Sequence, residues 1–485
     1  MIESQLPLLP LILDAVPQGL RQALAQEGVP FRDRRPGFLD GRFVLFDSRI
    51  CGRCTVDVGQ AALDVHELRE PGEPDLFAAL TNERSARFEW RLGGMTLSEE
   101  IARVDRRAAR RRLMERLREL VEVSGGVWLG VAPFPFPYRS AFNFRIDYDD
   151  YEPADFDAAL RAVAGQEQAT SHFVCGAAYE PAPEALRRLK GLDVGSHGYW
   201  HHTYRTLEEN LRNVGRGIDV LRAVGIEPYG FAAPHGRYNR GLAEALAALD
   251  VTYSSEFALA YDALPFFPGS SGVLQVPIHP VCLGLFLEAA RRKSDAAAVA
   301  REPAAVEAAV RYFRQEAQAR YRAGEPIFFY AHPTRQLGRY PQVLHHLLET
   351  VSEFGALWRT TLGEFSRWWR VRAGVRLSVT RALDRYVVRA EGHAGPYRPG
   401  IEYWRGEHVA LMPLDGGVLT FAPQALAYQR RATRRAFRPV RVDRPEGLRG
   451  HVRRLLDWER VTPVEEIGSG DWRNWAKRTL RRWWG

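Results

Sequence analysis

The fold is decided by the segment AFNFRIDYDD at residues 141–150, in which an apolar run ends in three carboxylates. The segment LDVGSHGYWHH at residues 192–202 has the same layout, because a short apolar run ends at His197 and His201 follows four residues later. Four residues are about one helical turn, so the two imidazoles can point the same way if a turn starts there. Borderline divalent metals such as zinc select imidazole and carboxylate ligands. The two segments therefore predict a mononuclear metal site.

Two further predicted strands end in polar side chains. The segment FAAPHG at residues 231–236 places His235 after a strand near 229–232, and IFFYAHP at residues 327–333 places His332 directly after an apolar run. Each of the first two clusters, taken alone, is more often a solvated turn or a surface histidine pair. In a barrel of parallel strands, however, the carboxyl ends converge on the face where the chemistry takes place. Four polar strand ends in one series therefore predict an active site.

Strands and helices alternate from about residue 138 to about residue 370, which favours a parallel α/β barrel. Predicted strands lie at 171–175, 192–196, 229–232, 251–254, 273–278 and 327–331, and predicted helices at 155–164, 184–190, 207–224, 241–249, 304–323 and 342–354. His279 follows the strand at 273–278. We expect a supporting or structural role for it, with metal ligation as the alternative.

The order of these motifs resembles the polysaccharide deacetylase (NodB-homology) group, carbohydrate esterase family 4, over residues 138–370. The resemblance implies a distorted (β/α)7 barrel that hydrolyses N-acetyl groups with one divalent metal. The family's aspartate motif matches Asp147-Tyr148-Asp149, so Asp147 would be the general base and Asp149 a metal ligand, with Asp150 as an alternative. The late histidine motif matches His332, which would be the general acid.

The family's His-x-x-x-His motif matches His197 and His201 as metal ligands, with His202 in the next position and without an assigned role. The family's Arg-x-Pro-Tyr motif reads Ala232-Ala233-Pro234-His235 here, so the arginine that orients the base is missing. Arg145 and Arg237 are candidate replacements. The side chains expected to contact the substrate are Tyr148, Asp150, Pro234, His235, Arg145 and Arg237.

The proposed chemistry also follows from the residue types alone. Two imidazoles and one carboxylate leave coordination positions open on a metal, which can then activate water and polarise a carbonyl. A second carboxylate would take the proton of the attacking water, and a histidine across the site would protonate the leaving nitrogen. We expect zinc, with cobalt, manganese or iron as alternatives.

The length and composition of the chain are typical of a folded protein with several domains. The chain has 485 residues, of which 46% are hydrophobic and 26% charged, and its net charge is +8. Only three of the 67 basic residues are lysines, and the arginines interleave with acids, as in residues 115–119. This pattern is typical of solvated helix faces. We therefore expect no nucleic-acid partner.

The flanking regions follow a different pattern from the barrel. Residues 1–95 are predicted to form a small α+β unit, with a helix at 11–26 and strands at 42–46, 55–58 and 87–92. Residues 96–137 are predicted as a linker helix, with Ser98 as the N-cap and an end near Val123. Residues 371–470 are predicted to form a small β-sandwich-like domain. Its Tyr403 and Trp404 are expected to be core aromatics, with a sugar platform as the alternative.

Residues 471–485 form a basic, tryptophan-rich segment. On a helix, Trp472, Ala476, Leu480 and Trp483 share one side, and basic residues lie mainly on the other. A cationic amphipathic helix suits an anionic membrane surface, although a terminal helix docked on the protein has the same pattern. The first 13 residues lack a basic n-region, and no apolar run approaches the roughly 18 residues that span a bilayer. We expect a cytoplasmic protein with peripheral contact to the inner membrane face through Trp472–Trp484.

Together these features predict a hydrolase that removes N-acetyl groups from an amino sugar of an envelope polysaccharide or its lipid-linked precursor. The alternatives are another C–N hydrolase, resembling the cyclic amidase allantoinase, and a glycan-binding pseudoenzyme.

Overall fold

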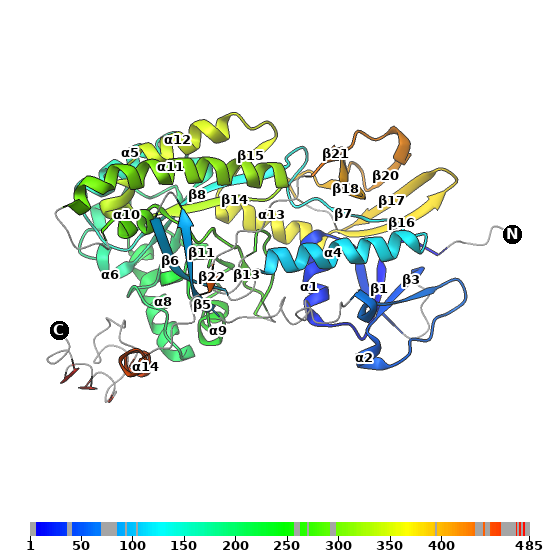
Figure 1. Ribbon diagram of the computed structural model, residues 1–485, viewed down its shortest axis with the longest axis horizontal. Coiled ribbons are helices and arrows are strands. Elements are labelled where there is room, and N and C mark those ends of the chain that lie inside the picture. The colour runs from blue at the N-terminus through cyan, green and yellow to red at the C-terminus, as the bar shows by residue number, and fades with distance from the viewer. Residues whose placement is uncertain are drawn as a thin grey trace.

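The computed structural model is shown in Figure 1. It describes residues 6–35, 41–68, 85–92, 95–102, 105–256, 262–268, 271–291, 297–392, 395–431, 440–441, 447–456, 472, 475–476 and 479–480.

A parallel sheet forms the centre of the molecule. Its strands run in the order β13-β12-β11-β10-β9-β8-β14, and β15 pairs with the start of β8. The predicted α/β barrel is confirmed, because all of these pairings are parallel and the seven strands of the path curl into a partial barrel. The bounds are β8 (Ser140–Tyr148), β9 (Thr170–Val174), β10 (Asp193–Ser196), β11 (Gly230–Phe231), β12 (Tyr253–Ser254), β13 (Leu274–Gln275), β14 (Ile327–Ala331) and β15 (Leu357–Arg359).

Helices cover the outer face of this sheet (Figure 1). Every residue of β8 and β14 is buried. Strand β14 is the continuous apolar run expected of a strand covered on both faces, whereas β8 also contains Asn143, Arg145 and Asp147. The N-terminus of α8 is capped by the Thr206 side chain, which accepts a hydrogen bond from the Glu209 N–H. The helices are α5 (Pro153–Ala162), α6 (Gly176–Tyr179), α7 (Pro183–Arg187), α8 (Leu207–Ala223), α9 (Arg240–Ala248), α10 (Leu283–Arg291), α11 (Ala297–Ala323), α12 (Gln342–Ser352) and α13 (Leu362–Gly374).

The predicted start of the linker helix at Ser98 is wrong. Ser98 lies within β6 (Met95–Ala102), which pairs with β5 (Ser85–Leu92) as an antiparallel hairpin. Helix α4 begins only at Arg106 and ends at Val123, and its N-cap is Asp105, whose side chain accepts from the Ala108 N–H at 3.0 Å. Cross-strand pairing and burial of Leu97 and Ile101 outweigh the local capping signal at Ser98.

The β5–β6 hairpin packs on the barrel. Its side chains Phe88, Trp90, Leu97 and Ile101 belong to the same hydrophobic core as the barrel strands. A boundary after residue 95 would therefore cut through an element that packs as one piece with the barrel.

The N-terminal region holds a parallel sheet in the order β2-β1-β3-β4. Strand β3 matches the predicted strand at 42–46, but residues 55–58 form no strand. The elements are β1 (Leu11–Asp14), α1 (Gln18–Glu27), β2 (Phe31–Asp33), β3 (Phe43–Phe46), α2 (Ser48–Cys51) and β4 (Ala61–Asp64).

The C-terminal region contains two small antiparallel sheets. One has the order β16-β17-β20 and the other β21-β19-β18-β7, so a strand that precedes the barrel completes the second sheet. One hydrophobic core contains side chains from β1, β3, α4, β7 and β16–β19, so the N-terminal and C-terminal regions share a core. Tyr403 is buried in this core, and Trp404 packs against it. The bounds are β7 (Leu129–Val131), β16 (Arg376–Ala382), β17 (Arg385–Glu391), β18 (Gly400–Arg405), β19 (His408–Pro413), β20 (Val418–Phe421), β21 (Gln429–Arg430), β22 (Val440–Arg441) and α14 (Leu448–Leu455).

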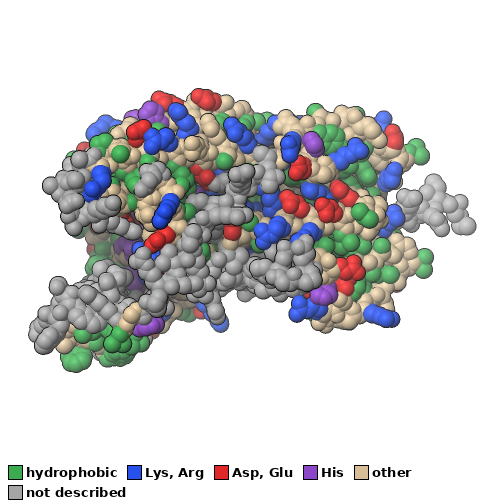
Figure 2. Space-filling view, viewed as in Figure 1, with side chains coloured by type: hydrophobic (Ala, Val, Ile, Leu, Met, Phe, Trp, Pro, Cys, Tyr) green, Lys and Arg blue, Asp and Glu red, His purple; other side chains and the backbone are tan. Residues whose placement is uncertain are grey.

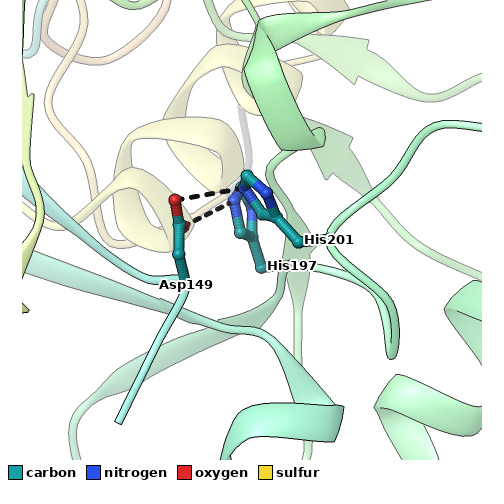
Figure 3. Close-up of side chains that lie close together, drawn as sticks. All are labelled: Asp149, His197 and His201. Carbon is teal, nitrogen blue, oxygen red and sulfur yellow. Dashed lines mark ion pairs between the residues drawn. The ribbon is translucent and has the colours of Figure 1, made fainter. Parts of the chain in front are cut away.

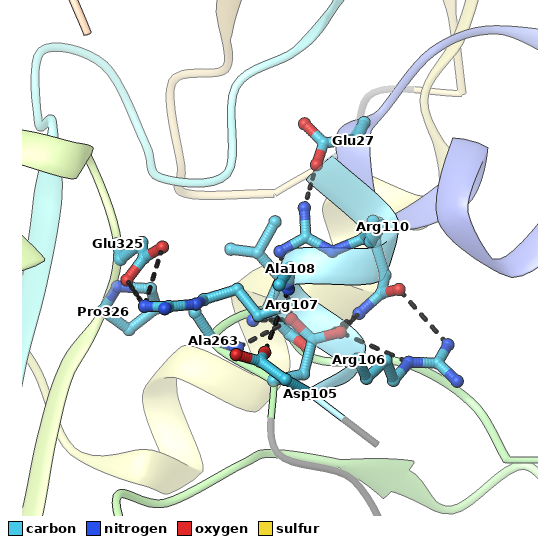
Figure 4. A network of polar contacts seen from close by, with 12 residues as sticks. Glu27, Asp105, Arg106, Arg107, Ala108, Arg110, Ala263, Glu325 and Pro326 are labelled. Carbon is cyan, nitrogen blue, oxygen red and sulfur yellow. Dashed lines mark hydrogen bonds and ion pairs between the residues drawn. The ribbon is translucent and has the colours of Figure 1, made fainter. Parts of the chain in front are cut away.

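Buried ion pairs tie α4 to its surroundings (Figure 4). Arg107 lies 3.1 Å from Glu325, and Arg110 pairs with Glu27 and lies 3.0 Å from Asp262. These arginines are buried, so the arginine-rich side of this helix is not only a solvated face. On the outer surface, basic and acidic side chains are interspersed, as expected from the sequence (Figure 2).

The prediction of a membrane-binding helix falls largely outside the described residues. Within 471–485, only 472, 475–476 and 479–480 are described, and they are helical. Trp472 and Trp475 are 55% and 72% exposed. Among the described helices, none combines the length and apolar character that crossing a bilayer requires.

Candidate metal centre and active site

Three predicted metal ligands meet at the carboxyl ends of β8 and β10. His197 Nε2 lies 3.2 Å from Asp149 Oδ1, and His201 Nε2 lies 3.1 Å from Asp149 Oδ2 (Figure 3). Within the described part of the chain, these residues form the one group of three or more such donors whose ligand atoms lie within 4.8 Å of one another. Their geometry therefore fits a shared divalent cation.

A backbone contact orients the buried His197 ring. Its Nδ1 lies 2.7 Å from the Ala232 carbonyl oxygen, which can only accept, so Nδ1 carries the hydrogen. Nε2 then has a free lone pair that faces Asp149. Protein metal sites commonly fix a histidine tautomer through such a second contact.

The carboxylate at the centre of the site is held ionised. Burial opposes the charged form of Asp149, but His332, His201 and His197 more than offset this effect and hold its pKa well below the usual range. A deprotonated carboxylate is the form that ligates a metal.

His332 follows β14 and faces the same carboxylate. Its Nε2 lies 3.4 Å from Asp149 Oδ2, and its Nδ1 lies 3.2 Å from Gln336 Oε1, which orients the ring. Burial lowers the pKa of His332, but the carboxylate of Asp149, together with smaller contributions from Cys282 and Asp147, raises it to about 10. A protonated imidazole can donate a proton to a leaving group.

Asp147 and Arg145 form a buried pair beside the ligands. Arg145 Nη2 donates to Asp147 Oδ2 at 2.6 Å, and Nη1 donates to the Ser255 carbonyl oxygen at 2.6 Å. Asp147 Oδ1 has no hydrogen-bond partner among the described residues. One oxygen of this carboxylate is thus held by an arginine, and the other is available in the cavity.

Comparison with known proteins places the barrel in a family. Residues 144–254 match the family model described as polysaccharide deacetylase. This match assigns the segment from β8 to β12 to the polysaccharide deacetylase family. No curated protein matches the chain.

Solved structures with a similar fold include a putative polysaccharide deacetylase from Mycobacterium smegmatis, at 19% identity and a TM-score of 0.41, covering 52% of this chain and 98% of that one. Puue allantoinase has 15% identity and a TM-score of 0.40, and the match covers 49% of this chain and 93% of that one. A CE4-family pseudoenzyme from Bacillus anthracis has 11% identity and a TM-score of 0.30, and the match covers 48% of this chain and 68% of that one.

Two residues predicted to contact the substrate, Tyr148 and Arg237, do not line the cavity. Tyr148 is fully buried, and its hydroxyl lies 2.9 Å from His172 Nδ1 in the core. Successive strand residues face opposite sides, so Asp147 and Asp149 reach the site while Tyr148 points away. Arg237 pairs with Glu100 at 3.8 Å, and no described contact joins it to Asp147.

The remaining predicted residues of the deacetylase domain divide between the cavity and its surroundings. Asp150 and His235 line the cavity, and the His235 ring lies 4.6 Å from the His201 ring. Pro234 is buried in the turn that positions His235. His202 is buried and packs against Tyr204.

His279 does not line the cavity. It is buried, and its Nε2 lies 2.6 Å from the Tyr312 hydroxyl. Its Nδ1 lies 3.1 Å from Arg320 Nη2.

The cavity of the deacetylase domain also contains residues that the sequence did not indicate. It measures about 270 Å³, and Glu99 from β6 and Glu288 from α10 line it. Burial, opposed in part by a backbone hydrogen bond, and the neighbouring Glu288 raise the pKa of Glu99 to about 7. Glu99 could be found only by knowing that the hairpin packs on the barrel.

Glu256 follows β12 at a strand end and was not indicated by the sequence, but it does not line the cavity. It is fully buried, its side chain accepts from the Ser254 hydroxyl, and burial raises its pKa to about 7. The same strand-end rule that identified His197 could have identified Glu256.

Proposed function

We propose that this protein is a metal-dependent hydrolase that removes the N-acetyl group from an amino sugar. The observation that carries the proposal is the convergence in one cavity of three metal-type donors, a carboxylate held by an arginine and a further histidine, His332.

Asp149, His197 and His201 would hold the metal, and their donor set suits zinc, with cobalt, manganese or iron as alternatives. The fit rests on the fixed His197 tautomer and on the ionised Asp149. When bound, the metal would act as a Lewis acid toward an amide carbonyl and toward water.

Asp147 is suited to accept the proton of the attacking water. Its Oδ1 is free to accept, and the bond from Arg145 to Oδ2 fixes the carboxylate plane. Arg145 would thus perform the orienting role of the arginine that the Ala232 position lacks.

His332 is suited to protonate the leaving nitrogen. Its Nδ1–H can donate to Gln336 Oε1, which directs Nε2–H toward the site. Asp147 and His332 both line the cavity, so a substrate amide can lie between them.

The charge of the cavity favours an uncharged or cationic glycan. Five carboxylates line it, and Arg145 is its one basic side chain other than histidine among the described lining residues. With a divalent cation bound and both Arg145 and His332 charged, the five carboxylates exceed the positive charges by one at most, because the pKa of Glu99 is about 7. An amino sugar without a nearby carboxylate is therefore the expected substrate, and the amine product would be stabilised.

Acetate release from N-acetylated oligosaccharides by the metal-loaded protein tests this function. A specific observation keeps a second candidate, hydrolysis of a cyclic amide: Ala232 and His235 replace the arginine and tyrosine of the family motif, and His235 lies against His201. Ring opening of allantoin without acetate release would favour this second activity. A protein that binds metal and glycan but turns over neither substrate would be a pseudoenzyme.

The envelope glycan and the membrane location are part of the same proposal. A Trp-rich, basic C-terminal helix would hold the enzyme at the inner face of the membrane, next to lipid-linked precursors. Exposure of Trp472 and Trp475 supports this. Full-length protein should co-sediment with anionic vesicles, less so at high salt, and a chain that ends at Gly470 should not. Loss of folding on truncation, or no co-sedimentation of full-length protein, would contradict it.

A further inference from the structure

A second cavity lies apart from the catalytic one. It measures about 460 Å³, compared with about 270 Å³ for the catalytic cavity, and the two have no lining residue in common. Its walls come from α1 and β2 of the N-terminal region, from residues 265–267 of the barrel and from the α13–β16 connection. Ligand sites commonly lie where such regions meet, and this volume is within their usual range.

Aromatic side chains provide the apolar walls of this cavity. Trp369 and Phe266 are buried there, at 2% and 5% exposure, and Phe31 and Phe267 are partly exposed. Arg370 lies over the Phe267 ring, with its Cζ 5.4 Å from the ring centroid. Arg372 Cζ likewise lies 4.3 Å from the centroid of the Trp369 ring, so guanidinium groups cover part of this aromatic surface and the rest can pack against a flat apolar group.

The charges that line this second cavity all have one sign. Arg21, Arg32, Arg372 and Arg376 contribute to the lining, and none of the described lining residues is an aspartate or glutamate. Arg21 pairs with Asp33 outside the lining. No carboxylate of the described residues pairs with Arg32 or Arg376. An arginine-lined cavity without carboxylates attracts anions and repels cations.

Arg372 is the deepest of these charges. It is 2% exposed, and its four hydrogen bonds go to the backbone carbonyls of Ala25, Gln26, Val131 and Ala132. A guanidinium has five N–H donors, so one donor on Nη1 is left over. Burial lowers the pKa of Arg372 to about 9. The Glu402 carboxylate opposes this effect in part, and the end of α1 adds a partial negative charge.

We propose that this second cavity binds a small organic anion with an aromatic or apolar body, such as an aryl carboxylate. The aromatic walls would pack against the body of the ligand, and the arginines would bind its acidic group, often in bidentate geometry. The site is independent of the proposed hydrolysis, because it shares no residue with the catalytic cavity.

Titration calorimetry with 2-naphthoate and its uncharged isostere 2-naphthamide tests the proposal. Naphthoate should bind at least tenfold more tightly than the amide and should alter tryptophan fluorescence through Trp369. Equal binding of the two probes, or no binding of naphthoate at millimolar concentration, would overturn the proposal.

Variants locate the bound probe. Arg376→Gln should weaken naphthoate binding severalfold, and Ala373→Phe, which fills the cavity from α13, should abolish it. Arg381→Gln is the matched control, because Arg381 lies on the same strand as Arg376 but not in the cavity. Binding should persist in the His197→Ala/His201→Ala protein, which excludes capture by a bound metal. Unchanged binding in both Arg376→Gln and Ala373→Phe would place the probe elsewhere and overturn the proposal.

Discussion

Arg145 Nη2 lies 2.6 Å from Asp147 Oδ2, and both side chains are almost completely buried. The two residues are two positions apart on β8, so they face the same side of the sheet. The proposed base and the arginine that holds it therefore come from one strand, whereas the family motif would supply the arginine from the position of Ala232. This pairing makes the role of Arg145 testable.

Arg145→Met should reduce kcat about 10²-fold, because Asp147 loses the contact that orients it. It should also lower the free energy of unfolding by about 3–5 kcal/mol, since a buried carboxylate is left unpaired. Acetate release and urea denaturation measure the two effects. Arg237→Gln is the control and should leave both near wild type, because Arg237 contacts Glu100 instead. An equal loss in both variants would contradict the assignment.

Asp147→Asn should abolish hydrolysis and leave the metal content unchanged. An asparagine preserves the shape of the side chain but cannot take a proton from water. Elemental analysis and acetate release on the same preparation separate the two properties. If metal is lost as well, the roles of Asp147 and Asp149 must be exchanged.

The His197→Ala/His201→Ala protein should lose the metal, because only one of three donors would remain. Wild type should contain about one divalent ion per chain, with zinc the first expectation. His346→Ala removes an exposed histidine on α12 and should retain the metal. Equal metal content in wild type and the double variant would remove the metal site from the proposal.

The barrel and its donors could be predicted because their signal is local. Asp149 and His197 directly follow β8 and β10, His201 lies four residues after His197, and parallel strands bring their carboxyl ends together. The same alternation that places Asp147 and Asp149 in the site turns Tyr148 into the core.

Features that depend on long-range packing could not be predicted. Ser98 has the local pattern of an N-cap, but pairing with Glu89 in a hairpin outweighs that pattern. Glu99 reaches the catalytic cavity only because this hairpin packs on the barrel. The shared core of the N-terminal and C-terminal regions joins residues that are far apart in the sequence.

Glu99→Gln should change the preference among substrates rather than the overall hydrolytic activity. Removing one carboxylate from the cavity should raise kcat/KM for oligosaccharides that carry a carboxylate and lower it for those that carry a free amine. A change of about three- to tenfold corresponds to ~1 kcal/mol. Glu89→Gln, on the partner strand and outside the cavity lining, is the matched control. Identical preference in wild type and Glu99→Gln would exclude Glu99 from substrate selection.

His172 should make the fold sensitive to acid. Burial lowers the pKa of its imidazole to about 4, from an ordinary value of 6.5. Its contribution to stability is therefore fully present above pH 6.5. As the pH falls from about 6.5 to about 4, the unfolded chain takes up a proton that the folded protein does not bind, and the free energy of unfolding decreases. A shift of about 2.5 pKa units corresponds to a loss on the order of 3 kcal/mol.

The measurement is urea denaturation at pH 7.5 and pH 4.5 for wild type and His172→Gln. The variant loses the contact with the Tyr148 hydroxyl, so its absolute stability falls at both pH values, and only the difference between the two pH values is diagnostic. This difference should be smaller than in wild type by about 2–3 kcal/mol, because no buried imidazole remains to be charged on unfolding. His408→Gln removes an exposed imidazole on β19 and should retain the wild-type pH dependence. If His172→Gln shows the same pH dependence as wild type, other buried groups cause the acid sensitivity of the barrel.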